Sequence, residues 1–190
     1  MLIREMTTEE CRDLLARKGF GRLACSFDRQ PYIVPIYFAV EDNDYLYGFA
    51  TLGRKIEWMR ANPLVCVETD EVVDHLRWKS VIVFGLYQEL PDESRWRRER
   101  QRAHDLLEKR PMWWQPAYVS SEHGGRPHSL KPVFYRIRID EMTGHEAAPD
   151  AHELAAMIEQ SVPLPGEEGR SSSILRRALG MLRHEKGVLN

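Results

Sequence analysis

The sequence predicts a mainly β protein whose antiparallel sheet closes on itself into a barrel, with a few peripheral helices. Short runs rich in Val, Ile, Tyr and Phe recur along the first 140 residues, as strands require. The early runs are joined by short polar connectors, which suit antiparallel hairpins. Helical patterns are few, so the sheet has little to cover it and must bury its apolar side against itself.

Composition limits the class of protein. The chain of 190 residues is long enough for one compact domain with a substantial core, and 43% of its residues are hydrophobic. A net charge of -2 argues against a dedicated nucleic-acid binder. No signal peptide and no apolar run long enough to span a membrane are visible. Cys11, Cys25 and Cys66 form no Cys-x-x-Cys pair, and we expect them to be buried thiols of a cytoplasmic protein.

In the first half of the chain, one predicted helix is followed by three predicted strands. A helix is expected after Thr7, because a Thr cap precedes an acidic first turn and Gly19 follows the last apolar positions. Three strand-like runs follow, at residues 20–27, 31–40 and 45–50. Their connectors, Asp28-Arg29-Gln30 and Glu41-Asp42-Asn43-Asp44, predict antiparallel hairpins.

The second half begins with a helix at residues 54–61, which Asn62-Pro63 ends. Further strands are predicted at 64–69, 77–90 and 132–140, and a helix at 92–109. The segment between this helix and the last strand contains prolines, Trp113, Trp114 and a Gly-Gly pair, so we expect a long loop. Loops of this length in a compact domain usually have a function or cover something.

Two parts of the chain are expected: a barrel domain at residues 1–146 and a C-terminal appendage at 147–190. The appendage contains a possible short helix at 151–160, a Pro/Gly/Glu linker at 163–169 and a basic amphipathic stretch at 172–186. That stretch is compatible with packing on its own barrel, docking on a partner or lying on a membrane surface. We expect the whole appendage, from about residue 147, to be dispensable for ligand binding by the barrel.

The turn after residue 50 has the chemistry of an anion site. Thr51 offers a hydroxyl, Gly53 allows close backbone approach, and Arg54 and Lys55 begin the predicted helix. The free N–H groups of a helix start carry the positive end of the helix dipole, so a phosphate is favoured there. The simpler alternative is a helix start with two solvated cations.

A family resemblance favours the phosphate. Besides the turn, four segments occur in a recognisable order: Gly21-Arg22-Leu23-Ala24, Pro31-Tyr32-Ile33-Val34-Pro35-Ile36-Tyr37-Phe38, Asn62-Pro63-Leu64-Val65-Cys66-Val67-Glu68, and Trp78-Lys79-Ser80-Val81-Ile82-Val83-Phe84-Gly85. Over residues 1–140 the chain resembles the pyridoxamine-phosphate-oxidase-like flavoproteins, whose fold is a split β-barrel, and most of all the branch that contains the nitroimidazole-resistance proteins. No single motif is decisive, but five in the right order are specific.

The resemblance implies an FMN site and its residues. The phosphate would be held at the turn and the flavin ring would lie along two strands. Because a single anion site at the turn suits one terminal phosphate, we expect FMN to be preferred over FAD or riboflavin. Core packing is the alternative role for Ile36 and Val81. The implied cofactor-binding residues are Val34, Pro35, Ile36, Tyr37, Ala50, Thr51, Gly53, Arg54, Lys55, Ser80 and Val81.

Two departures from the family limit what is carried over. Many nitroimidazole-resistance proteins have a histidine close to the flavin, and this sequence places Gly48 at that position. The arginines and serines with which true pyridoxamine-phosphate oxidases grip pyridoxal phosphate are not recognisable. We therefore assign no catalytic residue.

The resemblance also implies a homodimer, because a second subunit would complete a shallow cleft around a flat ring. Trp113, Trp114 and His128 are the candidates for the partner's contribution, the alternative being a self-packed loop. His123 and His128 lack a carboxylate or thiol at ligand spacing, so we expect no metal. The arginine-rich run 95–102 is diluted by acids and is expected to be a solvated helix face.

The function implied is an FMN-dependent oxidoreductase that passes electrons from a nicotinamide donor to a small, flat substrate. The alternatives are a non-catalytic flavin or haem binder and a deazaflavin-dependent reductase. A haem would need an axial His, Tyr or Cys on the barrel face.

Overall fold

The computed structural model describes residues 1–41, 44–110 and 132–155. The chain divides into two units, Leu2–Ala148 and the segment from Pro149 together with Met1. In the second unit residues 151–155 are helical, and the Met1 ammonium lies 2.9 Å from the Asp150 carboxylate. The strands of the first unit are β1 (Leu2–Glu5), β2 (Phe20–Phe27), β3 (Gln30–Glu41), β4 (Tyr45–Thr51), β5 (Leu64–Asp74), β6 (Arg77–Glu89) and β7 (Pro132–Ala148). The helices are α1 (Thr8–Lys18), α2 (Arg54–Ala61), the 3-10 turn η1 (Ser94–Trp96) and α3 (Arg97–Glu108).

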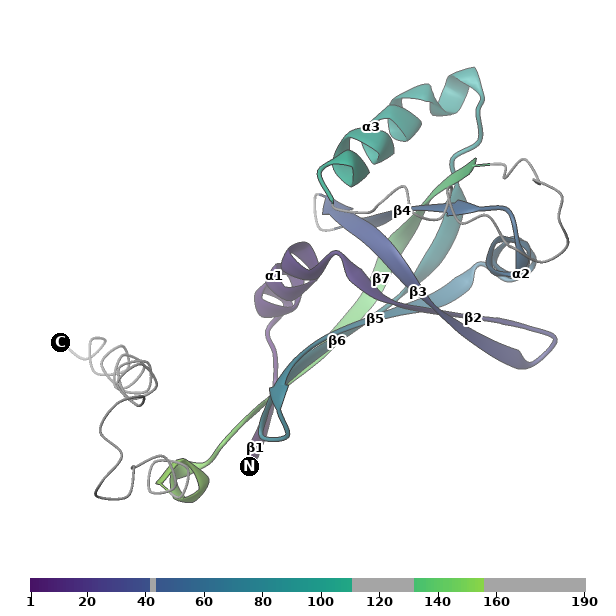
Figure 1. Ribbon diagram of the computed structural model, residues 1–190. Coiled ribbons are helices and arrows are strands. Elements are labelled where there is room, and N and C mark those ends of the chain that lie inside the picture. The colour runs from purple at the N-terminus through teal and green to yellow at the C-terminus, as the bar shows by residue number, and fades with distance from the viewer. Residues whose placement is uncertain (42–43, 111–131, 156–190) are drawn as a thin grey trace, which may run out of the picture. The chain divides into compact units, whose positions relative to one another are not determined.

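The sheet is antiparallel and closed, as predicted. Its strand order is β1-β7-β4-β3-β2-β5-β6, and β6 also pairs with β7 (Figure 1). The strand β7 therefore closes the ring, because it pairs with β4 along Pro132–Arg138 and with β6 along Tyr135–Ala147. The short strand β1 pairs with the far end of β7. This architecture is the split barrel that the family resemblance implied.

The hairpin between β2 and β3 is tighter than the sequence suggested. Asp28 and Arg29 both have positive φ, 47° and 62°, and Gln30 already belongs to β3. Two consecutive residues with positive φ make the primed turn whose twist matches that of the flanking strands. The predicted hairpin is confirmed, with a connector of two residues.

Three strands differ from the prediction. The strand β1 was not predicted, β5 continues past residue 69 to Asp74, and β7 continues past residue 140 to Ala148. All four residues of β1 are exposed, so no alternation marks it. The end of β7 contains Gly144 and several acids, which disfavour a strand, yet it is paired with β6 on one side and β1 on the other. Tertiary pairing overrides local preference here.

The helix α1 begins and ends as predicted. The Thr7 hydroxyl accepts a hydrogen bond from the Glu10 amide at 3.3 Å, and the Glu10 carboxylate accepts one from the Thr7 amide at 2.8 Å. This capping box satisfies two amides of the first turn. At the other end Gly19 adopts φ 61°. Leu14 and Leu15 are buried against the barrel.

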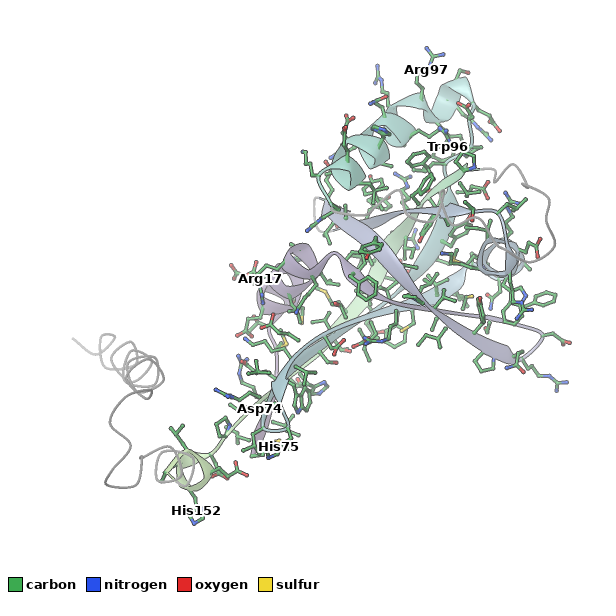
Figure 2. All side chains as sticks on the ribbon, in the orientation of Figure 1. Arg17, Asp74, His75, Trp96, Arg97 and His152 are labelled. Carbon is green, nitrogen blue, oxygen red and sulfur yellow. The ribbon has the colours of Figure 1, made fainter. Side chains whose placement is uncertain are left out.

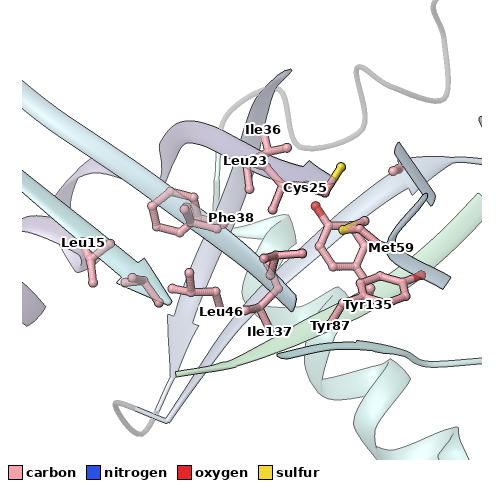
Figure 3. Packing of buried hydrophobic residues seen from close by; sticks show 14 of the residues in the cluster. Leu15, Leu23, Cys25, Ile36, Phe38, Leu46, Met59, Tyr87, Tyr135 and Ile137 are labelled. Carbon is pink, nitrogen blue, oxygen red and sulfur yellow. The ribbon is translucent and has the colours of Figure 1, made fainter. Parts of the chain in front are cut away.

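The core fills the barrel with aliphatic and aromatic side chains from every strand except β1 (Figure 3). The predicted burial of the cysteines holds for Cys11 and Cys25, but Cys66 is half-exposed on the outer face. The reason is the strand alternation of β5, which turns Val65 and Val67 inward and Cys66 outward.

The helix α3 packs over β3 and β4, and Arg97 at its start points away from the sheet (Figures 1 and 2). Two further arginines of α3, and Arg95 of η1, make local polar contacts. Arg95 pairs with Glu93 at 2.7 Å, Arg102 pairs with Glu41, and Arg100 donates to the Leu90 carbonyl at 2.9 Å. These contacts agree with a solvated helix face. No helix in the part of the chain that the structure describes is long and apolar enough to cross a membrane.

Candidate functional site

The barrel is open along one edge of β3. This strand pairs with β2 over Gln30–Tyr37, but with β4 only over Phe38–Glu41. Among the described residues, the other edge of Gln30–Tyr37 therefore has no strand partner. Its outward carbonyls, and the outward N–H groups of residues other than Pro31 and Pro35, are available to a ligand. Beyond Gly48 the strand β4 pairs with β7 but no longer with β3, and the turn into α2 follows.

The turn itself leaves its helix start uncapped. Gly53 is the N-cap residue of α2 and makes no side-chain cap, while its carbonyl accepts from the Glu57 amide at 3.0 Å. A Cβ atom placed on Gly53 would meet no atom of the described residues within 4 Å. Open space therefore adjoins the start of α2, whose first amides receive no side-chain cap from Gly53, and Thr51 is half-buried at the end of β4.

Two cations stand at this helix start without a carboxylate partner among the described residues. Arg54 is exposed, and its guanidinium carbon lies 5.7 Å from the centre of the Tyr32 ring. Lys55 is half-buried near Cys25, and burial lowers the pKa of its ammonium. A desolvated ammonium that forms no ion pair is stabilised by an incoming anion. Charge, free amides and empty space therefore coincide at this turn.

The four candidate residues of β3 divide between the two faces of the sheet. Ile36 is buried in the core and Val34 packs against it, whereas Pro35 is exposed and Tyr37 is half-exposed. The Tyr37 ring lies 5.1 Å from the ring of Phe20 on the outer face. Alternation along a strand means that only two of these side chains can face one flavin ring. The other two can contribute backbone groups alone.

The structure does not bring Ser80 and Val81 next to the turn. They lie on β6, and β2 and β5 separate that strand from β3. On the other side, Ser80 pairs with His145 of β7, whereas Thr51 pairs with Pro132 at the opposite end of that strand. Val81 is fully buried in the core, in agreement with the packing alternative, and Ser80 is half-exposed on the outer face.

Gly48 is covered by the protein's own side chain. It pairs with Tyr135 across β4 and β7, and an added Cβ would lie 2.5 Å from the Tyr135 hydroxyl oxygen. Tyr135 is almost fully buried, its pKa is raised by burial, and its hydroxyl has no hydrogen-bond partner among the described residues. The space that a histidine would occupy is therefore filled by this tyrosine. Ala50, two residues further along β4, is also buried in the core.

The remaining candidates, Trp113, Trp114 and His128, lie outside the described residues, as does His123. Among those described, His104, Asp105 and Glu108 of α3 place ligand atoms within 4.8 Å of one another. Asp105 and Glu108 are exposed, and Asp105 already accepts a hydrogen bond from Gln101 at 2.8 Å. An ordinary helix surface explains this cluster.

Sequence reasoning missed one feature beside the turn, an aromatic cluster formed by Phe27, Tyr32 and Trp58. The three residues come from β2, β3 and α2, so no spacing in the sequence connects them. The only signal was the hairpin itself, which places positions 27 and 32 close together.

Comparison with known proteins identifies the class. Residues 7–146 match the pyridoxamine 5'-phosphate oxidase family, and the chain belongs to that family. A solved FAD-binding protein from Mesorhizobium loti, mll6688, is 42% identical and has a TM-score of 0.63, with 78% of this chain and 99% of that chain covered.

Two further proteins are similar to this chain. The uncharacterized protein RA0666 of Rhizobium meliloti is 43% identical over 147 residues, which are 77% of this chain and 97% of that protein. A protein from Bacteroides thetaiotaomicron named as a putative 5-nitroimidazole antibiotic resistance protein shares the fold at 19% identity, with a TM-score of 0.55 and coverage of 77% of this chain and 89% of that chain. These likenesses agree with the family resemblance found in the sequence.

Proposed function

We propose that this protein is a flavoprotein that holds FMN by its phosphate at the turn between β4 and α2. The observation that carries the proposal is the half-buried ammonium of Lys55, which has no carboxylate partner among the described residues. Arg54 and the free amides of the first turn of α2 complete an anion site. The flavin-binding relative from Mesorhizobium supports a flavin phosphate as the anion.

The unpaired edge of β3 is the place for the flavin ring. Tyr32 on this edge contacts Arg54 of the turn, and the backbone groups of the edge can hydrogen-bond the polar edge of a flat ring. Pro35 and Tyr37 would contribute side chains from the outer face. A bound flavin would supply hydride and electron transfer, and the residues of the chain would bind it, orient it and tune it.

The outer face of the sheet supports a homodimer. Ile33, Ala24, Cys66 and Phe84 form one cross-strand row over β3, β2, β5 and β6. Ile33 is 62% exposed, Phe84 is 45% exposed, and Leu64 on the same face is 64% exposed. A contiguous exposed apolar face on a sheet usually marks an interface. The partner would form the second wall of the flavin site, with Trp113, Trp114 and His128 as the proposed contributors.

The reaction proposed is electron transfer from a nicotinamide donor through FMN to a small substrate. It takes place in a cytoplasmic homodimer that binds neither nucleic acid nor a metal. The absorbance spectrum of the purified protein tests the cofactor class, because flavin, haem and deazaflavin spectra differ. A flavin spectrum with NADH or NADPH oxidation is expected. A Soret band would contradict the proposal, and a flavin that neither donor reduces would contradict the reaction while leaving binding intact.

The dimer is tested by mass. Ile33→Lys places a charge in the middle of the apolar row and is expected to yield a monomer with weaker FMN binding. Val73→Lys is the matched control, because Val73 is 65% exposed at the tip of the β5–β6 hairpin, away from that row. A wild-type monomer loaded with flavin at low concentration would contradict the shared site.

A further inference from the structure

A cavity lies between the start of α3 and the hairpin of β3 and β4, away from the turn assigned to the flavin phosphate. Its volume is about 280 Å³, and Arg136 of β7 also lines it. Tyr45, which borders the cavity, begins β4, whereas the phosphate turn follows Thr51 at the end of that strand. Six residues of a strand span roughly 20 Å, so the cavity and the turn are separate places.

The wall of the cavity carries charges of both signs. Three arginines and three carboxylates line it: Arg98, Arg102, Arg136, Glu41, Asp44 and Glu99. A ligand with a net charge would upset this balance, whereas a zwitterion brings one charge of each sign and preserves it.

Half of these charged groups are already engaged with the protein. Arg102 pairs with Glu41. Arg136 donates from Nε to the Gln88 side-chain oxygen at 2.6 Å, and its guanidinium carbon lies 4.3 Å from the centre of the Tyr45 ring. These contacts fix the shape of the wall and leave the other three groups to a ligand.

The three groups that remain are one cation and two anions. The side chains of Arg98 and Asp44 are exposed and form no ion pair or hydrogen bond among the described residues. Glu99 is half-buried, and one of its carboxylate oxygens is buried without a hydrogen-bond partner there. Buried polar atoms without a partner are rare, and each requires an explanation. Because a carboxylate rotates easily about its last side-chain bond, a donor inside the cavity can satisfy Glu99.

The positions of Arg98 and Glu99 on α3 separate the two charges. Consecutive residues of a helix point about 100° apart around its axis. In agreement with this, Glu99 is half-buried on the wall of the cavity and Arg98 is exposed at its rim. An ammonium and a carboxylate on one small molecule can therefore contact them at the same time.

Two tyrosines provide the rest of the wall. The ring centroids of Tyr45 and Tyr47 are 6.2 Å apart, and Tyr47 is almost fully buried while Tyr45 is half-exposed. Burial raises the pKa of the Tyr47 hydroxyl, so this residue stays neutral and adds no charge. Aromatic rings stack well against a further ring, and this part of the wall therefore suits an aromatic group.

We propose that this cavity binds a free aromatic amino acid. Glu99 and Asp44 would contact its ammonium group, Arg98 its carboxylate, and the two tyrosines its ring. The volume lies at the lower end of the range for small-molecule pockets, roughly 300–1,000 Å³, which agrees with a ligand of this size. The proposal does not depend on the flavin site.

Calorimetric titration of the full-length wild-type protein tests each contact with a different ligand. L-Phenylalanine is compared with phenethylamine, which lacks the carboxylate, with 3-phenylpropionate, which lacks the ammonium, and with L-alanine, which lacks the ring. Each analogue should bind at least about tenfold more weakly than L-phenylalanine, because it loses a charge-assisted hydrogen bond or a stacked ring. An analogue that binds as tightly as L-phenylalanine, or no binding of L-phenylalanine, would overturn the proposal.

Variants of α3 assign the contacts to residues. Glu99→Gln should remove the advantage of L-phenylalanine over 3-phenylpropionate, and Arg98→Gln its advantage over phenethylamine. The matched controls on the same helix are Glu108→Gln and Arg97→Gln, since both residues are exposed, neither lines the cavity, and Arg97 points away from the sheet (Figure 2). Test variants that behave like these controls would overturn the assignment. The comparison of ligands on the wild-type protein still decides if Glu99→Gln does not fold.

The same titrations with and without saturating FMN separate this proposal from the proposed function. The affinity for L-phenylalanine should be the same in both conditions, because the two sites lie at opposite ends of β4. Competition between FMN and L-phenylalanine would overturn the placement in this cavity. A protein that binds L-phenylalanine but no flavin would support this proposal and overturn the proposed function.

Discussion

Two glycines of one segment, Gly48 in β4 and Gly53 at the start of α2, stand in opposite surroundings. A Cβ on Gly48 would collide with the buried ring of Tyr135, whereas a Cβ on Gly53 would meet none of the described atoms within 4 Å. The first glycine makes room for the protein's own side chain. The second borders space that the described chain leaves empty, beside two cations without carboxylate partners. A glycine required for packing and a glycine beside a ligand site are thus distinguished by what occupies the space where a side chain would be.

The largest effect is expected at Gly48, where Tyr135 fills the space beside the glycine. Gly48→His, which restores the residue found in many nitroimidazole-resistance proteins, should lower the free energy of unfolding by about 3 kcal/mol or more, because the imidazole has no space beside Tyr135. Chemical denaturation measures this. Tyr135→Phe is the control and should leave stability unchanged or raise it by about 1 kcal/mol, since it removes a buried hydroxyl without a partner among the described residues. A stable Gly48→His protein would show that Tyr135 moves aside.

The next largest effect is expected for FMN binding at the open turn beside Gly53. Lys55→Ala and Arg54→Ala should each weaken FMN binding by about 1–3 kcal/mol, the usual cost of losing a charge-assisted hydrogen bond, while the fold survives. The matched control is Arg60→Ala at the other end of α2. Arg60 donates twice to Glu89, at 2.7 Å each, so its loss should cost about 1 kcal/mol of stability and leave FMN binding intact. Normal FMN affinity in both folded test variants would mean that Arg54 and Lys55 are only solvated cations.

A pH titration sharpens the same point. Burial holds the pKa of Lys55 below its usual 10.5, and a bound phosphate would raise that pKa again. At pH values between the pKa of Lys55 in the free protein and its pKa in the complex, Lys55 takes up a proton when FMN binds. FMN affinity should therefore fall as pH rises through the lowered pKa, by up to about tenfold per pH unit. In the ligand-free protein the sign is opposite, because the folded state holds fewer protons there and stability rises with pH up to 10.5. Lys55→Ala should abolish both slopes, and a slope that persists in this variant belongs to another group.

The smallest effect concerns Gly53. Its φ of 175° is extended backbone that alanine also adopts. Gly53→Ala should therefore stabilise the ligand-free protein by about 0.4–1 kcal/mol by restricting the unfolded chain. The same methyl group would intrude where the phosphate approaches, so FMN affinity should drop. A variant with unchanged affinity would place the phosphate elsewhere.

The sequence predicted most of the barrel because its signals are local. The Thr7 cap, the Asp28-Arg29 turn and Asn62-Pro63 each fix an element boundary through chemistry within a few residues. The strand β1 and the outer part of β7 escaped prediction because they are held by pairing with distant strands rather than by alternation.

In the candidate site, too, contiguous features could be predicted from the sequence and features made by distant segments could not. The turn at Thr51 to Lys55 is contiguous, so its chemistry was legible in the sequence. The unpaired edge of β3 depends on the register of three strands, and the contact of Phe27, Tyr32 and Trp58 depends on how α2 packs. Neither has a pattern along the chain. The placement of Ser80 on a distant strand likewise became visible only from the strand order.

The central claim is that the open turn binds a flavin phosphate, and comparing FMN with riboflavin tests it most directly. The two ligands share the ring and differ in the phosphate. Wild type should bind FMN at least about a hundredfold more tightly than riboflavin, and Lys55→Ala should reduce that ratio about tenfold while riboflavin affinity stays constant. Equal affinities of the wild-type protein for FMN and riboflavin would contradict the claim.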